Sequence, residues 1–164
     1  MSGSRQLVLD ASVIIKWHLQ DELFVQEALA LRSEFTSGLV SILVPDHLRY
    51  EVPNAVYVAC RRGRLPFEEA HMTVAQFLSW DFAFVSTSDL ILRAFTASHR
   101  FSCSLYDALY LALAEQQAIP FITADKRLFD TIKDEIPGVT WLGDYRPQAT
   151  PSPREKRFTV GVTP

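Results

Sequence analysis

The sequence predicts an α/β fold built on a parallel sheet, and three observations point to it. Its apolar runs are short and continuous, which is typical of strands buried on both faces of a sheet. Amphipathic segments lie between these runs, and strands that alternate with helices favour a parallel sheet. The chain has 164 residues, 48% of them hydrophobic, which is enough for one domain with a substantial core.

The expected elements follow from local patterns along the chain. Strands are expected at 6–9 (QLVL), 41–44 (SILV), 120–123 (PFIT) and 139–142 (VTWL), with a weaker candidate at 82–85 (FAFV). Helices are expected near 23–35, 46–62, 67–79, 89–98, 104–117 and 126–134. Pro45 and Asp46 mark the start of the second helix, and Pro66 suits the first turn of the third. Gly38 and Gly63 are expected to end helices.

Composition and charge limit the kinds of function. The formal net charge of −3 argues against a passive nucleic-acid coat protein, but it allows an enzyme that concentrates acids in one cleft. Cys60 and Cys103 fit neither a disulfide framework nor a zinc site. No apolar run approaches a membrane span and the N-terminus lacks a signal-peptide core, so we expect a cytoplasmic protein without membrane contact.

A change of composition near Gly143 suggests two units. Residues 1–142 are expected to form the α/β domain. Residues 143–164 are rich in proline and polar residues, and we expect them to form a C-terminal tail outside the core.

Two acids follow predicted strands at the points where those strands end. Asp10 comes directly after LVL, and one residue separates Asp125 from FIT. Ligands of open α/β sheets bind outside the carboxyl ends of the strands, so both acids reach one crevice if their strands are neighbours. One such acid is often only a helix N-cap, but Ser12 after the first acid and Thr123 before the second strengthen the functional interpretation.

A third acid lies on the apolar face of the helix expected at 46–62. Glu51 shares that inward face, and Asn54 lies one turn further along it. A helix-edge glutamate paired with an arginine is the alternative interpretation. Pro53 lies between the two polar residues and predicts either a kink or a later start of this helix.

The fourth acid, Asp107, opens the apolar helix SLYDALYLALAE. Ser104 and Asp107 have the spacing of a capping box, so capping and function are both open on this stretch alone. Four acids that converged without a counter-charge would repel one another severely, and a divalent cation is the usual solution. All-oxygen ligands favour Mg²⁺ or Mn²⁺. A magnesium ion bound by a few carboxylates and by the phosphates of a substrate is typical of metal-assisted phosphodiester hydrolysis.

Four stretches in order resemble the PIN domain family, and within it the VapC-type toxin ribonucleases: LVLDASVIIKW (7–17), EVPNAV (51–56), SLYDALYLALAE (104–115) and FITADKRLF (121–129). The resemblance implies an α/β/α sandwich with a central parallel sheet of four to five strands flanked by helices. It also implies a metal-dependent endoribonuclease, the toxin of a type II toxin–antitoxin pair. Such a protein is usually a homodimer, restrained by a small cognate antitoxin of the VapB type.

The resemblance also assigns roles to residues. The four acidic roles fall on Asp10, Glu51, Asp107 and Asp125. The three aspartates are expected to hold one or two Mg²⁺ or Mn²⁺ ions, and the glutamate is a further ligand or a group that orients water. Polar residues that orient these carboxylates are expected at Ser12, Asn54 and Thr123. Weaker candidates for contacts with RNA phosphates, each also interpretable as a solvated surface charge, are Lys16, Arg62 and Lys126.

Two other classes of function remain as alternatives. One is a catalytically silent PIN-like binding protein, in which the acids do not act. The other is an aspartate-based phosphotransferase or phosphatase. The phosphatase type usually has a second acid two residues after the first, where this chain has Ser12, and a receiver-like module needs an acid pair that is not evident.

Overall fold

The computed structural model describes residues 4–19 and 22–147, which contain one five-stranded parallel sheet. Its strands are β1 (Arg5–Leu9), β2 (Val40–Pro45), β3 (Ala83–Val85), β4 (Phe121–Thr123) and β5 (Val139–Trp141). The strand order is β3-β2-β1-β4-β5, so the chain moves away from β1 in one direction first and in the other later. The junction of β1 and β4 is therefore the switch point where α/β sheets bind ligands.

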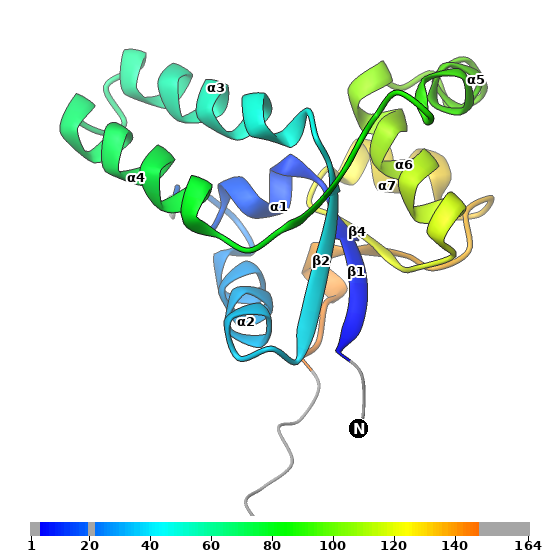
Figure 1. Ribbon diagram of the computed structural model, residues 1–164, viewed down its shortest axis with the longest axis horizontal. Helices are drawn as coiled ribbons and strands as arrows, with labels where there is room; N and C mark the ends of the chain where they lie inside the picture. The colour runs from blue at the N-terminus through cyan, green and yellow to red at the C-terminus, as the bar shows by residue number, and fades with distance from the viewer. Residues whose placement is uncertain (1–3, 20–21, 148–164) are drawn as a thin grey trace, which may run out of the picture.

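Helices cover both faces of this sheet. They are α1 (Ala11–Ile15), α2 (Val25–Thr36), α3 (Leu48–Arg61), α4 (Phe67–Ser79), α5 (Ile91–Phe101), α6 (Leu105–Gln117) and α7 (Lys126–Ile132). Figure 1 shows α1 and α2 on one side of the sheet and α5, α6 and α7 on the other, while α3 and α4 lie side by side and extend away from it. The predicted α/β/α sandwich with a central parallel sheet is confirmed.

The core lies between β1, β2 and α6. Residues Leu7–Leu9 of β1 are almost fully buried, and every α6 residue from Ala108 to Ala114 is buried as well. Helix α6 packs on β1, β2 and β4, which explains why it is apolar nearly all round. Asp107 stands at the beginning of this buried run.

Helix α1 was not predicted from the sequence. It has only five residues, too few to show a helical period, and its residues ASVII continue the apolar run of β1. Asp10 is its N-cap, and the carboxylate accepts hydrogen bonds from the amides of Ser12 and Val13. The acid after the first strand is therefore a helix cap as well as a candidate functional group.

The ends of the helices follow their turn residues, with one difference at α3. Gly38 and Gly63 have φ of 76° and 72°, the left-handed conformation expected where glycine ends a helix. Helix α3 begins at Leu48 rather than near Asp46, because the Asp46 amide instead donates to the carbonyl of Val85 at 2.9 Å.

Pro53 lies inside helix α3 and does not end it. The helix starts five residues earlier, at Leu48, and continues through the proline to Arg61. The start at Leu48 is two residues later than the predicted start near 46, in line with one of the two expectations from Pro53, and Glu51 belongs to the helix. In the described part of the chain, no helix is both long and apolar enough to cross a bilayer.

The chain stays packed against the sheet beyond β5. A short 3-10 helix covers Leu142–Asp144, and Tyr145 after it is buried. The Tyr145 hydroxyl donates to the carboxylate of Glu34 and accepts a hydrogen bond of 2.8 Å from Arg5. The rest of the predicted tail, 148–164, lies outside the described residues.

Candidate functional site

The backbone brings all four predicted acids to the carboxyl edge of the sheet. Asp10 ends β1 and Asp125 follows β4, while Glu51 and Asp107 lie in the first turns of α3 and α6. Helix α3 leaves β2 at this edge, and α6 runs from it back to the start of β4. Both helices therefore begin where the strands end, as Figure 1 shows.

Asp10 is held at the junction of β1 and β4. The pairing of Leu9 with Ile122 puts Asp10 opposite Thr123. The Thr123 hydroxyl donates to Oδ2 of Asp10, and Ser12 donates to Oδ1 through both its hydroxyl and its amide, the latter at 2.8 Å. Both carboxylate oxygens are thus fixed by the polar residues that the sequence analysis singled out.

The environment of Asp10 disfavours its negative charge. Burial raises its pKa to about 6, although hydrogen bonds from Ser12 and Thr123 lower it, and the charge of Asp107 adds to the rise. The residue is only 4% exposed. Within the described residues the carboxylate has no ion-pair partner, so a bound cation would relieve the cost of this charge.

Asp107 and Asp125 line one cavity of about 190 Å³ between α6 and α7. Ser104 caps α6 by accepting a hydrogen bond from the Asp107 amide at 3.1 Å, and its hydroxyl donates to the Asp107 carboxylate at 2.7 Å. Asp125 caps α7 by accepting a hydrogen bond from the Leu128 amide at 3.0 Å. The capping role near Asp107 is therefore filled by Ser104, and the aspartate side chain faces the cavity.

The neighbouring acids act on the charge of Asp107. Burial raises the pKa of Asp107 despite the hydrogen bond from Ser104, and the charges of Asp125 and Glu51 raise it further. Like charges raise a carboxyl pKa only at short range. The cluster thus concentrates negative charge, with Arg127 in the wall of the same cavity.

Glu51 is positioned by two residues that sequence reasoning missed. The Tyr110 hydroxyl donates to Oε2 of Glu51 at 2.5 Å, and Nε2 of His47 lies 3.1 Å from the same oxygen. The His47 ring also packs edge-on against Tyr110 at 5.0 Å. The spacing of His47 and Glu51, four residues apart on one helix, was an available signal, whereas the contact with Tyr110 depends on the packing of α3 against α6.

The other predicted residues lie further from the acids or are already paired. Asn54 is exposed on α3, and Tyr110 rather than Asn54 holds the Glu51 carboxylate. Arg62 is the C-cap of α3, about three turns beyond Glu51. The structure does not bring Asn54 or Arg62 into contact with the acids.

Both predicted lysines form ion pairs beside the site. Nζ of Lys16 lies 2.7 Å from Glu22, and Nζ of Lys126 lies 2.5 Å from Asp130. Lys16 is nearly buried, whereas the Lys126 side chain is half exposed. Lys126 is therefore the more accessible of the two.

The donors at this edge suit a hard divalent cation. Among the described residues, no three His, Cys, Asp or Glu side chains gather closely enough to hold a metal ion by themselves. Magnesium does not need such a cage, because it usually keeps several waters and binds through one or two carboxylates plus substrate phosphates. The all-oxygen donors and the unpaired, buried charge of Asp10 fit that mode of binding.

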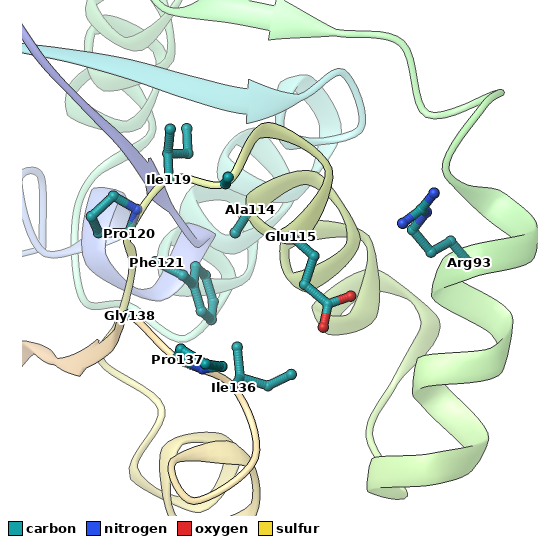
Figure 2. Close-up of a pocket in the computed structure, with 10 residues that line it drawn as sticks. Arg93, Ala114, Glu115, Ile119, Pro120, Phe121, Ile136, Pro137 and Gly138 are labelled. Atoms are coloured by element: carbon teal, nitrogen blue, oxygen red, sulfur yellow. The ribbon is translucent and has the colours of Figure 1, made fainter.

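Another hollow lies at the opposite edge of the sheet. It has a volume of about 570 Å³ and is bounded by Pro120 and Phe121 at the start of β4, at the edge opposite the acids. Figure 2 shows its wall, with Glu115 from α6 and Ile136 and Pro137 from the loop before β5. Its size does not make it the functional site, since the buried carboxylates lie at the other edge.

Comparison with known proteins agrees with this arrangement. A family model of the PIN domain matches residues 7–134. Ribonuclease VapC3 of Pyrobaculum aerophilum is 29% identical over 127 residues, covering 75% of this chain and 92% of that protein.

Two solved structures share the fold at lower identity. VapC20 of Mycobacterium tuberculosis, described as a sarcin-ricin loop cleaving toxin, has a TM-score of 0.57 at 18% identity, over 79% of this chain and 95% of its own. DNA-bound VapBC of Salmonella typhimurium has a TM-score of 0.57 at 14% identity, over 84% of this chain and 98% of the matched chain. At these identities the likeness shows the fold alone.

Proposed function

Because the chain belongs to the PIN domain family, we propose that it is a metal-dependent endoribonuclease, the toxin of a type II toxin–antitoxin pair. The observation that carries the proposal is the meeting of acids at the switch point of the sheet. Asp10 is fixed there by Thr123, and Asp107 and Asp125 line the adjoining cavity. The names of the relatives, a ribonuclease and an RNA-cleaving toxin, support the same reaction.

In this proposal Asp10, Asp107 and Asp125 hold Mg²⁺ or Mn²⁺, and Glu51 is a further ligand or orients water. When bound, the cation acidifies water and offsets the charge that builds up on the phosphate. The protein supplies the positioning. Asp10 cannot turn away from the cleft because three hydrogen bonds from Ser12 and Thr123 hold its oxygens.

Neighbouring side chains orient two of the other three carboxylates. The Ser104 hydroxyl orients Asp107, and the Tyr110 hydroxyl orients Glu51. Such support of ligand carboxylates is typical of metal sites, where it fixes geometry before the substrate arrives. An aspartate that accepts a phosphoryl group in the manner of the phosphatases usually has a second acid two residues later, where this chain has Ser12.

The test compares two acids on one helix, Asp107 and Glu115. Glu115 is exposed near the far end of α6, against the hollow at the opposite edge. We expect the wild-type protein to cleave total RNA with Mg²⁺ but not with EDTA. Asp107→Asn should abolish cleavage, and Glu115→Gln should leave it unchanged. Equal cleavage in EDTA would contradict the metal, and RNA binding without cleavage in Mg²⁺ would favour the catalytically silent binding protein.

We also propose two protein partners, a second copy of the chain and a small VapB-like antitoxin. Exposed apolar side chains lie on α5, where Leu92 is 83% and Phe95 68% exposed, and such patches mark interaction surfaces. An apolar hollow of about 160 Å³ between α3 and α4 is bordered by Tyr57, Phe67 and Val74, and it suits an antitoxin helix. The VapBC complex among the similar structures supports such a partner. Leu92→Lys should convert a dimer to a monomer in light scattering, and a wild-type monomer at all concentrations would contradict the pairing.

A further inference from the structure

We propose that a second hollow, next to the acids, binds the nucleotide that flanks the cleaved phosphate, with its base against Trp141 and a phosphate at Lys126. This inference rests on the proposed ribonuclease function and names the part of the substrate that the site recognises. The hollow has a volume of about 540 Å³, and we call it the Trp141 hollow. Its walls include Lys16, Leu23, Phe24, Ala124, Lys126 and Trp141.

The Trp141 hollow lies close to the predicted acids. Ala124 and Lys126 line the Trp141 hollow, whereas Asp125 between them lines the cavity that it shares with Asp107. Consecutive Cα atoms lie only about 3.8 Å apart, so the two hollows lie along the same short stretch of backbone. The Ala124 amide also donates to the Ser12 hydroxyl at 3.0 Å, and that hydroxyl contacts Asp10. An RNA strand with its phosphate at the acids must continue along a neighbouring surface, and the Trp141 hollow is lined by the two chain neighbours of Asp125.

The Trp141 ring forms an aromatic wall of this hollow. The Trp141 ring meets Phe24 edge-to-face, with centroids 4.7 Å apart and planes at 73°. A Cβ atom at Gly143 would come within 2.6 Å of the same ring, so the indole lies tightly against the backbone of Gly143. A rigid, half-buried aromatic ring in a groove is the usual platform for stacking an unpaired base.

The ammonium group of Lys126 places a positive charge beside this ring. Nζ of Lys126 lies 5.4 Å from the centre of the Trp141 ring and is bound to Asp130. Lys133 also pairs with Asp130, at 3.3 Å. Lys126 can therefore turn to a phosphate while Asp130 keeps a cationic partner. The ammonium and the indole together match one nucleotide, a phosphate next to a base.

The carboxylate of Glu22 does not oppose this role. Lys16 and Arg64 both pair with Glu22, at 2.7 and 3.3 Å, so its negative charge is balanced within the wall. The Lys16 side chain is only 10% exposed and its ammonium is used in that pair. We therefore assign the phosphate contact to Lys126, while Lys16 supports the wall.

The experiment measures KM and kcat in Mg²⁺ on a labelled RNA oligonucleotide that spans a cut site mapped on total RNA. Lys126→Gln should raise KM severalfold with little change in kcat, and it should reduce the slope of log(kcat/KM) against log salt by about 0.7, the loss of one phosphate contact. Arg93→Gln is the control, because it removes one positive charge beside the hollow at the opposite edge of the sheet and leaves the cluster of Lys126, Asp130 and Lys133 intact. It should leave KM and the slope unchanged.

The aromatic wall is tested by a pair of substitutions at Trp141. Trp141→Leu should raise KM about tenfold through the loss of base stacking, and Trp141→Phe should recover most of that loss. Equal KM values for Lys126→Gln, Arg93→Gln and wild type would overturn the assignment even if Trp141→Leu failed to fold. Cleavage by the wild type with no effect of these variants refutes the nucleotide site alone, whereas a wild type that cleaves no RNA refutes the proposed function and this inference together.

Discussion

Replacing Asp10 by asparagine should stabilise the metal-free protein at neutral pH, because the change removes a buried negative charge. Burial raises the pKa of Asp10 from its ordinary value of 3.8 to about 6. One pKa unit corresponds to about 1.4 kcal/mol, so the ionised carboxylate costs the folded state about 3 kcal/mol at high pH.

The size of this cost depends on pH. Between pH 3.8 and about 6 the folded protein keeps a proton on Asp10 that the unfolded chain has released. The free energy of unfolding contributed by this group therefore falls as the pH rises through that window. The cost is absent below 3.8 and complete above about 6.

Asparagine keeps the shape of the side chain but not all of its hydrogen bonds. Its amide nitrogen must face the hydroxyl of either Ser12 or Thr123, each of which now donates to the Asp10 carboxylate. A mismatch of this kind costs about 1 kcal/mol. The net effect of Asp10→Asn should be a gain of about 1–2 kcal/mol at neutral pH, which disappears or reverses near pH 4.

Urea unfolding in EDTA at neutral pH and near pH 4 measures this effect as the difference between variant and wild type. Asp130→Asn is the control, because Asp130 is exposed on α7 and hydrogen bonds from Lys126 and Lys133 lower its pKa. Its pH dependence should run in the opposite direction and remain small. The reasoning is refuted if Asp10→Asn destabilises the protein at neutral pH or has the same effect at both pH values.

Three further predictions concern the site and its wall. Asp107→Asn should raise the melting temperature in EDTA, because it relieves repulsion among the acids, and should remove the stabilisation by Mg²⁺, as calorimetry with and without the ion would reveal. Tyr110→Phe should cost about 1–2 kcal/mol in urea unfolding, because Glu51 loses its donor at 2.5 Å, and an unchanged stability would contradict that bond. Gly143→Ala should cost about 1–3 kcal/mol, because a Cβ atom would lie 2.6 Å from the Trp141 ring; full stability would mean that the ring can shift freely.

The local sequence pattern alone predicted nearly every strand and helix. The helix predicted at 67–79 has those bounds in the structure, because a proline precedes it and its apolar residues keep a helical period. Helix α1 escaped prediction because five residues are too few for a period to show. The positions of Asp10 and Asp125 at strand ends were also readable, since that placement depends only on where each apolar run stops.

Tertiary structure decided which of these groups meet. Asp10 and Thr123 are 113 residues apart, and they touch only because β4 pairs with β1 rather than with β3 or an edge strand. The contact of Tyr110 with Glu51 likewise requires α3 and α6 to begin at one edge of the sheet. Strand order is set by the packing of all the layers together, and no single stretch of sequence carries it. The sequence could therefore name the acids, but only the fold could bring them to the same edge of the sheet.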